Sequence, residues 1–352
     1  MKYTKQIISH LHLCYSLAEL TYQGEHCFLA AAEQEDPCFL FSEEGKHIAT
    51  PWTRPGGVMT MQALPGKDGE FLAIHKFYSP DDSKQAEIIW CAPDGKGGWV
   101  VNTLVPAPFV HRFGILERNG VHYLIICCLK SGHEYPDDWR FPGAVYAAVL
   151  PDDLSPYHAQ NPLPVRKIKE GILKNHGYCY CPMDGQDHAL VTGEEGVFLF
   201  TPPESPDKKW EIRCLLETPV SDAVLCDFDG DGKRELGVIE QFHGDTLSIF
   251  HLNGEGQYEK CWEYPEKLEM LHAIWAGDLC GKKCFVAGNR KGKRKTLIIS
   301  LENGVYQEEL LEADAGAANV LHFQNRKGQD ILVAANREAD EVTMFTFEET
   351  GA

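Results

Sequence analysis

The sequence lacks any excess of positive charge. Among 352 residues, Lys and Arg total 33 against 52 Asp and Glu, so the formal net charge is -19. No basic stripe interrupts this acidic background, and we therefore expect neither nucleic acid nor an anionic membrane as a partner. No apolar run approaches the roughly 18 residues of a transmembrane helix, and no apolar signal segment follows the first ten residues. We expect a protein that is neither membrane-spanning nor secreted.

Disulfide-type cysteine spacing is also absent. The 13 cysteines are an odd number, and most lie inside apolar strand-like runs such as Cys127-Cys128. This usage is typical of buried free thiols in a reducing compartment, so we expect a cytoplasmic location. The sequence contains no glycine-rich phosphate loop between a strand and a helix, and no Gly-x-Ser-x-Gly elbow. Nucleotide binding and hydrolase-type serine chemistry therefore have no support.

Helical periodicity is scarce, and a β-rich repeat takes its place. A helix of one or two turns is expected only at 308–315. The repeat consists of an apolar strand, a polar glycine turn, a second strand and a third strand. Its clearest copies span 223–250, 273–299 and 319–345, and looser copies begin near His12, Val58, His111 and His176. Seven units of about 50 residues are typical of four-stranded propeller blades, whereas a β-sandwich would not explain seven equal periods.

The predicted fold is therefore an all-β, seven-bladed β-propeller that forms a single domain over residues 1–352. The last unit contains only three strands, and the N-terminal stretch has no partner within its own unit. A ring leaves no open sheet edge if the N-terminal strand completes the last blade. We predict that residues 2–8 form the outermost strand of blade seven.

Histidines recur at matched positions of the repeat. His111, His176 and His272 lie where the innermost strands of their units begin, and His12 opens the first unit in the same way. Equivalent strand starts in a ring point toward one axis, and neutral imidazole is a ligand for Zn²⁺, Mn²⁺ and Fe²⁺. We predict a divalent metal in the central channel, held by His111, His176 and His272. The alternative for each histidine alone is a hydrogen bond to the backbone.

The ends of the second strands carry further polar residues toward the same face. A small-molecule carbohydrate substrate is expected there, because rings that can stack on sugars lie beside carboxylates and an arginine. Arg112 would hold a carboxylate or a sugar oxygen, and His133 or Tyr178 would act as the proton acceptor. The expected substrate-binding residues are His75, Glu134, Trp139, Glu240, His243, Asn289 and Asn336. A channel-filling Tyr178 and a solvated loop at 133–142 are the alternatives.

An aspartate-glycine turn at 227–235 has the spacing of a calcium loop. Alternate carboxylates can wrap a hard cation, and the candidate ligands are Asp227, Asp229, Asp231 and Glu235. The alternative is a tight β-turn in which these side chains satisfy the backbone.

The repeat and this turn resemble the FG-GAP/VCBS propellers. The central units, with His111-Arg112, His176, 227–235, His243-Gly244-Asp245 and His272, are similar to the propeller part of aldos-2-ulose (anhydrofructose) dehydratases. The resemblance implies metal-assisted elimination of water from a keto-sugar, the reaction of a carbon–oxygen lyase. The cupin-like domains of the larger dehydratases have no counterpart in this sequence.

A second class of function stays open. Propellers serve many unrelated roles, so this one could be a non-catalytic platform that binds a protein or a carbohydrate. Such a platform should present an apolar or aromatic rim and needs no converging histidines. The sequence leaves the sugar, the metal and the oligomeric state undetermined.

Overall fold

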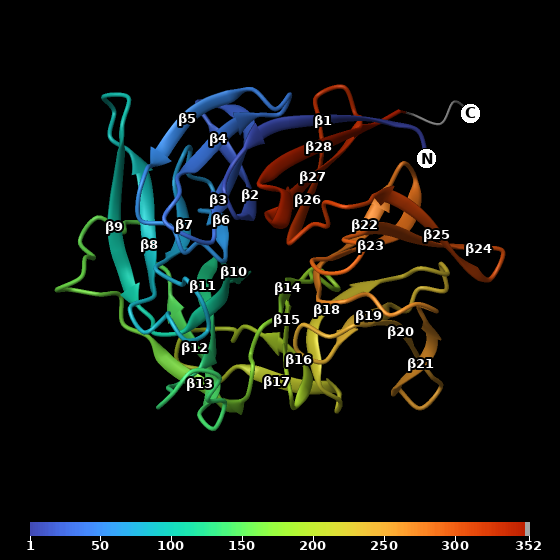
Figure 1. Cartoon of the computed structure of the whole chain (residues 1–352). Helices are drawn as coiled ribbons and strands as arrows, with labels where there is room; N and C mark the ends of the chain where they lie inside the picture. The colour runs from blue at the N-terminus through green and yellow to red at the C-terminus, as the bar shows by residue number, and fades with distance from the viewer. Residues whose placement is uncertain (349–352) are drawn as a thin grey trace.

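Seven four-stranded antiparallel sheets stand in a ring, one strand of each next to the central axis (Figure 1). The computed structural model describes residues 1–348. Over these residues the chain forms 28 β-strands and one three-residue 3-10 helix, η1 (Arg337–Ala339). The predicted all-β, seven-bladed propeller is confirmed.

Each sheet is one blade, and its four strands follow one another from the axis outward. The first four blades consist of β2 (Cys14–Tyr22), β3 (Glu25–Ala32), β4 (Cys38–Ser42) and β5 (His47–Trp52); β6 (Met61–Ala63), β7 (Phe71–His75), β8 (Glu87–Pro93) and β9 (Trp99–Pro106); β10 (Val110–Arg118), β11 (Val121–Lys130), β12 (Pro142–Val149) and β13 (Arg166–Ile172); and β14 (Tyr178–Tyr180), β15 (Ala189–Gly193), β16 (Gly196–Thr201) and β17 (Glu211–Leu216). The last three consist of β18 (Val220–Cys226), β19 (Glu235–Glu240), β20 (Thr246–Leu252) and β21 (Tyr258–Glu263); β22 (Leu271–Leu279), β23 (Lys282–Asn289), β24 (Thr296–Glu302) and β25 (Val305–Glu312); and β26 (Asn319–Gln324), β27 (Asp330–Asn336), β28 (Glu341–Phe347) and β1 (Tyr3–His10).

The seventh blade combines strands from opposite ends of the sequence. β1 pairs antiparallel with β28, with Tyr3 opposite Phe347 and His10 opposite Glu341. The Tyr3 ring packs against Phe345 and Phe347, with centroids 5.6 and 5.5 Å away. Figure 1 shows β1 alongside β28. The N-terminal strand is held there by a hydrogen-bonded ladder and by aromatic packing.

Two local expectations are wrong. Residues 305–312 form strand β25, because their side chains alternate along an edge of blade six instead of following a helical stripe. His12 does not open the first inner strand; it lies in the preceding turn, where its exposed ring pairs with Asp36. All 13 cysteines are free thiols and nine of them are buried, as expected. Within residues 1–348 no helix is long and apolar enough to cross a membrane.

The core lies between neighbouring blades. Each blade is covered on both faces, so its second strand is a nearly continuous apolar run. The last eight residues of β11 are buried, and β27 is buried along its whole length. This packing fixes the ring and therefore the points from which side chains project toward the axis.

Candidate functional site

Four inner strands carry a β-bulge at the same place, one residue after the strand begins. The register shifts between residues 14 and 16 in β2, 110 and 112 in β10, 220 and 222 in β18, and 271 and 273 in β22. A bulge leaves one residue out of the ladder and re-aims its side chain. The four residues so displaced are Tyr15, His111, Ser221 and His272. Side chains from blades one, three, five and six therefore meet at one mouth of the channel.

Four imidazoles gather there, and we call them the histidine cluster: His111, His176, His243 and His272. The His176 ring centroid lies 4.2 Å from that of His111, 4.9 Å from that of His243 and 5.2 Å from that of His272. One ring nitrogen from each of His176, His243 and His272 lies within 4.8 Å of the other two. The structure thus brings together all three predicted metal ligands and adds His243, which the sequence placed among the substrate-binding residues. His111 lies next to His176, but its ring nitrogens are not part of this group of three.

Hydrogen bonds at Nδ1 orient three of these rings. His111 Nδ1 donates to the His176 carbonyl oxygen at 3.1 Å, and His272 Nδ1 donates to the Ala318 carbonyl oxygen at 2.7 Å. His176 Nδ1 donates to the Asp222 carboxylate at 2.8 Å. An Nδ1 that carries the proton leaves a lone pair on Nε2. The three rings therefore present basic Nε2 atoms to the channel, and His243 Nε2–H donates to His176 Nε2 at 3.2 Å.

Burial disfavours protonation of three imidazoles of the cluster. It lowers the pKa of His111, His243 and His272 well below the usual value, and the neighbouring imidazoles and arginines lower it further. Burial alone would raise the pKa of Asp222, but its contacts with His176 outweigh that effect, so the carboxyl is ionised. Neutral imidazoles held by an ionised carboxylate are suited to bind a cation.

A strained turn delivers His243. Gln241 and His243 have φ angles of 61° and 51°, in the left-handed region that non-glycine residues seldom adopt. A Cβ on Gly244 would lie 2.0 Å from the Glu240 carbonyl oxygen, so this position requires glycine. Backbone strain of this kind clusters at functional sites.

Tyr15, Ser221 and Asp222 were missed by the sequence analysis. The Tyr15 hydroxyl donates to His272 Nε2 at 2.9 Å and lies 3.5 Å from His111 Nε2. Burial raises the pKa of Tyr15 to about 12. Ser221 donates to Asp222 at 2.8 Å and so supports the carboxylate that orients His176. Tyr15 is the blade-one equivalent of His111, a signal that a search limited to histidine overlooks.

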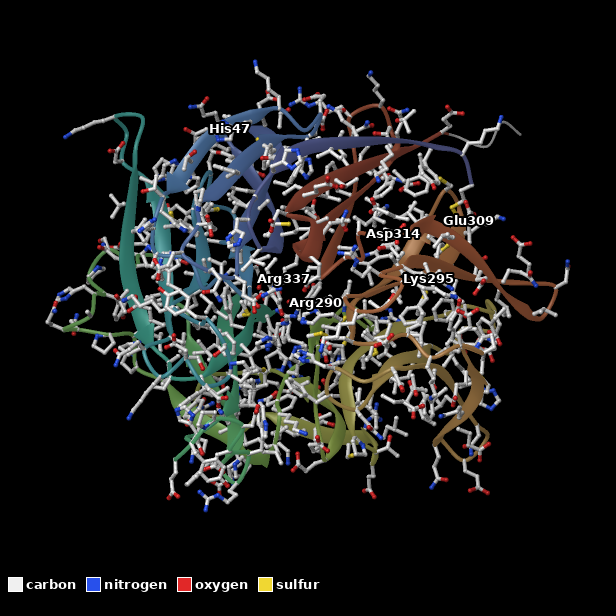
Figure 2. All side chains as sticks on the ribbon, in the orientation of Figure 1. His47, Arg290, Lys295, Glu309, Asp314 and Arg337 are labelled. Atoms are coloured by element: carbon white, nitrogen blue, oxygen red, sulfur yellow. The ribbon has the colours of Figure 1, made fainter. Side chains whose placement is uncertain are left out.

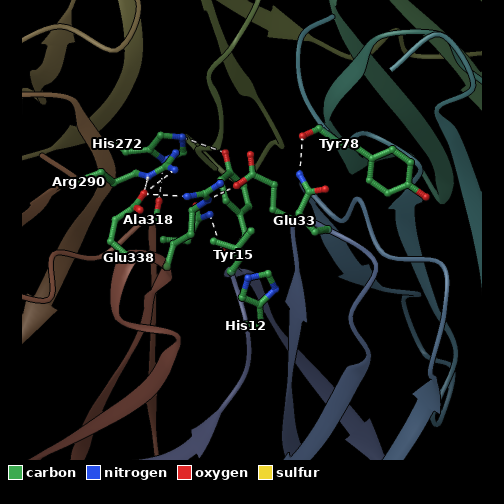
Figure 3. A network of polar contacts seen from close by, with 12 residues as sticks. His12, Tyr15, Glu33, Tyr78, His272, Arg290, Ala318 and Glu338 are labelled. Atoms are coloured by element: carbon green, nitrogen blue, oxygen red, sulfur yellow. Dashed lines mark hydrogen bonds and ion pairs between the residues drawn. The ribbon is translucent and has the colours of Figure 1, made fainter. Parts of the chain in front are cut away.

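A ring of ion pairs borders the cluster on the side of blades six, seven and one. Arg290 Nη2 donates to Glu338 at 2.8 Å, and Arg337 Nη1 donates to the same carboxylate at 2.9 Å. Arg337 also contacts Glu33 through Nε. Figure 2 places Arg290 and Arg337 near the centre of the ring, and Figure 3 shows Arg290 and Glu338 beside His272.

The long loop 133–142 packs over the cluster from blade three. Trp139 contacts Phe242 at a centroid distance of 5.3 Å, and Phe242 stacks on His243 at 4.0 Å. The loop is held by the buried Asp138, which accepts hydrogen bonds from Arg140 and from the backbone of Glu134. Among the expected substrate-binding residues, Trp139 and His243 therefore join the site, whereas Glu134 lies on the outer part of the loop and pairs with Arg140.

The other four expected substrate-binding residues make contacts within the blades or their connecting loops. His75 is buried beside Trp52, and burial lowers its pKa to about 3. Glu240 accepts a hydrogen bond from Ser248. The Asn289 side chain donates to the Glu269 carbonyl oxygen and accepts from the Lys295 backbone, and Asn336 donates to Glu312 and Thr343.

The expected proton acceptors lie outside the cluster. His133 pairs with Asp81 at 3.2 Å, next to the buried ammonium group of Lys130. Tyr178 is packed between blades three and four: a Cβ on Gly114 would lie 1.8 Å from its hydroxyl. Burial raises the pKa of Tyr178 well above the usual value.

The aspartate turn connects β18 to β19. Asp227 accepts from the backbone of Gly230 and Gly232, and Asp231 accepts from Lys233. Asp227, Asp229 and Glu235 also offer oxygen atoms within 4.8 Å of one another. The side chains satisfy the turn's own amides, as the β-turn alternative requires, and the spacing leaves the calcium prediction untested.

Comparisons with known proteins show the fold alone. No family model matches the chain, and no curated protein matches it. A solved structure of streptogramin B lyase aligns with 97% of this chain and 97% of its own length, with a TM-score of 0.55 and 13% sequence identity. At that identity the alignment shows a shared seven-bladed propeller and carries no evidence for FG-GAP or anhydrofructose dehydratase relatedness.

Proposed function

We propose that the protein is a metal-dependent carbohydrate lyase or dehydratase that acts on a keto-sugar or a related sugar derivative at the mouth of the central channel. One observation carries the proposal: ring nitrogens of His176, His243 and His272 lie within 4.8 Å of one another although they come from different blades or loops. Neutral imidazoles need a reason to converge, and a shared cation supplies one.

The donor set fits a divalent transition metal such as Zn²⁺, Mn²⁺ or Fe²⁺. Imidazole nitrogen suits all three, and burial keeps His243 and His272 unprotonated. Metal-binding histidines commonly donate their other N–H to a carboxylate or a backbone carbonyl, as His176 does to Asp222 and His272 does to Ala318. Bound there, the ion would polarise a substrate carbonyl and acidify the adjacent C–H.

His111 and Tyr15 are the groups best placed to move protons. His111 Nε2 would accept the C–H proton, and Tyr15 would donate its hydroxyl proton to the departing oxygen. The C–H and C–O bonds break, a C=C bond forms, and the product leaves with water or an alcohol. Because the two side chains lie 3.5 Å apart, His111 can return its proton to Tyr15 and restore both groups. This assignment replaces His133 and Tyr178, which lie outside the histidine cluster.

The walls of the mouth suit a sugar. Trp139 and Phe242 offer aromatic surface next to the polar cluster, and Arg112 offers a guanidinium on the blade-three side. Apolar rings with a few convergent polar groups are typical of small-molecule sites. The streptogramin B lyase with the same fold bears a lyase name, which makes elimination chemistry on such a ring a reasonable proposal.

Elemental analysis of purified protein tests the proposal. We expect stoichiometric metal in the wild type and loss of metal in His272→Ala, with the fold retained because the blade ladders do not depend on this side chain. His47→Ala, an exposed histidine far from the axis, is the matched control (Figure 2). A scan of keto-sugars for a new enone absorbance then tests the reaction. Protein without metal, and inert after Zn²⁺, Mn²⁺ or Fe²⁺ is supplied, would instead favour the non-catalytic platform.

A further inference from the structure

Arg112 is a buried cation at the edge of the histidine cluster. It directly follows the bulge of β10, and only 8% of its surface is exposed. Its Nη1 donates to the Met59 carbonyl oxygen at 2.5 Å, and its guanidinium carbon lies 5.8 Å from the centre of the Tyr15 ring. One donor is therefore fixed by the backbone, while the guanidinium as a whole stands beside the channel groups.

No carboxylate of residues 1–348 forms an ion pair with Arg112. The other two arginines at this mouth are both paired, Arg290 with Glu338 and Arg337 with Glu33. Asp222 is in the same site and the charge of Arg112 lowers its pKa, but the hydrogen bonds of its carboxylate come from His176 and Ser221. An imidazole is either neutral or positively charged, so the histidines supply no counter-charge.

The charge of Asp222 offsets part of the Arg112 charge, but within the described chain the guanidinium N–H groups other than Nη1 have no protein acceptor, which is costly in a protein interior. From this geometry we infer that the missing partner belongs to the ligand: the substrate is an acidic sugar, and its carboxylate binds Arg112. This inference rests on the proposed function for the identity of the site as a sugar site, and it names the substrate class. A cation in the histidine cluster would add positive charge and strengthen the preference for an anion.

The free N–H donors of one guanidinium match a carboxylate better than a phosphate. A guanidinium with one nitrogen occupied still presents further N–H donors, and an edge with two donors fits the two oxygens of a carboxylate. A phosphate dianion calls for more donors, but Arg290 and Arg337 are already paired and the sequence has no phosphate loop. During elimination, Arg112 would also stabilise the negative charge that develops next to the carboxylate.

The test is calorimetric binding to metal-free protein, with D-glucuronate and D-galacturonate as acidic probes, D-glucose as the neutral probe and inorganic phosphate as the alternative anion. We expect the uronates to bind and glucose and phosphate not to. Arg112→Gln should weaken uronate binding on the order of 30-fold or more, the typical effect of removing one partner of a buried charge pair. Arg118→Gln is the control, because Arg118 lies at the far end of β10 and contacts Pro202.

Stability provides a readout that needs no ligand. If Arg112 awaits an external anion, Arg112→Met should lower Tm less than Glu338→Gln, which unpairs Arg290. Uronate binding that persists in Arg112→Gln, no saturable uronate binding, equal binding of glucose, or tighter binding of phosphate would each overturn the inference. These results do not depend on metal, so wild-type protein that lacks metal and stays inert after Zn²⁺, Mn²⁺ or Fe²⁺ is supplied would refute the proposed function and leave this inference standing.

Discussion

Replacing Asp222 with Asn should weaken metal binding at the histidine cluster without unfolding the ring. The Asp222 carboxylate accepts from His176 Nδ1 and from the Ser221 hydroxyl, each at 2.8 Å, and it is buried. Asn keeps the shape and one acceptor oxygen but removes the negative charge, so the oxygen that accepts from His176 and Ser221 becomes a weaker acceptor. His176 then loses both the charge that makes Nε2 a better donor and the bond that fixes its ring.

Loss of such a supporting carboxylate typically costs 10- to 100-fold in metal affinity, equivalent to about 1.4 to 2.8 kcal/mol. We expect this loss for Zn²⁺ and Mn²⁺ in competition with a chelator at pH 7.5. Asp245→Asn is the control, because Asp245 lies just after the turn that carries His243 but faces solvent and pairs with Lys267.

Two measurements make the outcome decisive. Circular dichroism and Tm establish that Asp222→Asn is folded before affinity is compared. His176→Ala should then reduce affinity at least as strongly, because it removes the nitrogen that Asp222 supports. A folded Asp222→Asn protein with wild-type affinity, together with an unaffected His176→Ala, would refute the assignment of His176 as a ligand.

Three further outcomes are expected. Burial lowers the pKa of His243 well below its usual value, so below about pH 6.5 the unfolded chain binds a proton that the folded protein does not. The Tm of metal-free protein should therefore fall as the pH drops below about 6.5, and it should fall less steeply in His243→Gln. Equal slopes in the two proteins would contradict this. Trp139 packs on Phe242, which stacks on His243, so Trp139→Ala should loosen that stack and weaken metal binding roughly 2- to 10-fold. Tyr135 is exposed in the same loop, and Tyr135→Ala should leave metal binding unchanged. If the aspartate turn is only a β-turn, Asp229→Asn should lower Tm slightly, and added Ca²⁺ should not change the Tm. A strong rise of the wild-type Tm with micromolar Ca²⁺ would show an ion site instead.

The repeat made the ring predictable. Strand and turn signals recur with one period, and ring symmetry then brings His111, His176 and His272 to the same axis although more than 150 residues separate the first from the last. No single strand carries that information, because each histidine alone is equally consistent with a local hydrogen bond. The count of blades and the matched positions together placed these residues correctly.

The details that failed depend on register. The bulge in β2 places Tyr15 at the axis, three residues after the His12 that the repeat pattern favours. Successive residues of a strand point to opposite faces of the sheet, and both faces of a blade pack on neighbouring blades. His75 and Asn336 lie on second strands, so His75 packs beside Trp52 and Asn336 donates to Glu312 instead of reaching the channel.

The recurrent bulge separates chemistry from architecture. The displaced residues contribute little to the ladders, which resume their pairing immediately afterwards in all four strands. Because the ladder pairing does not include these four residues, we expect each side chain to be exchangeable while the blade that carries it stays assembled. A propeller built this way can acquire a new ligand set or a new proton donor by single substitutions at bulge positions spaced around one axis. Redesign of this mouth should therefore begin at 15, 111, 221 and 272, which lie outside the ladder register of their strands.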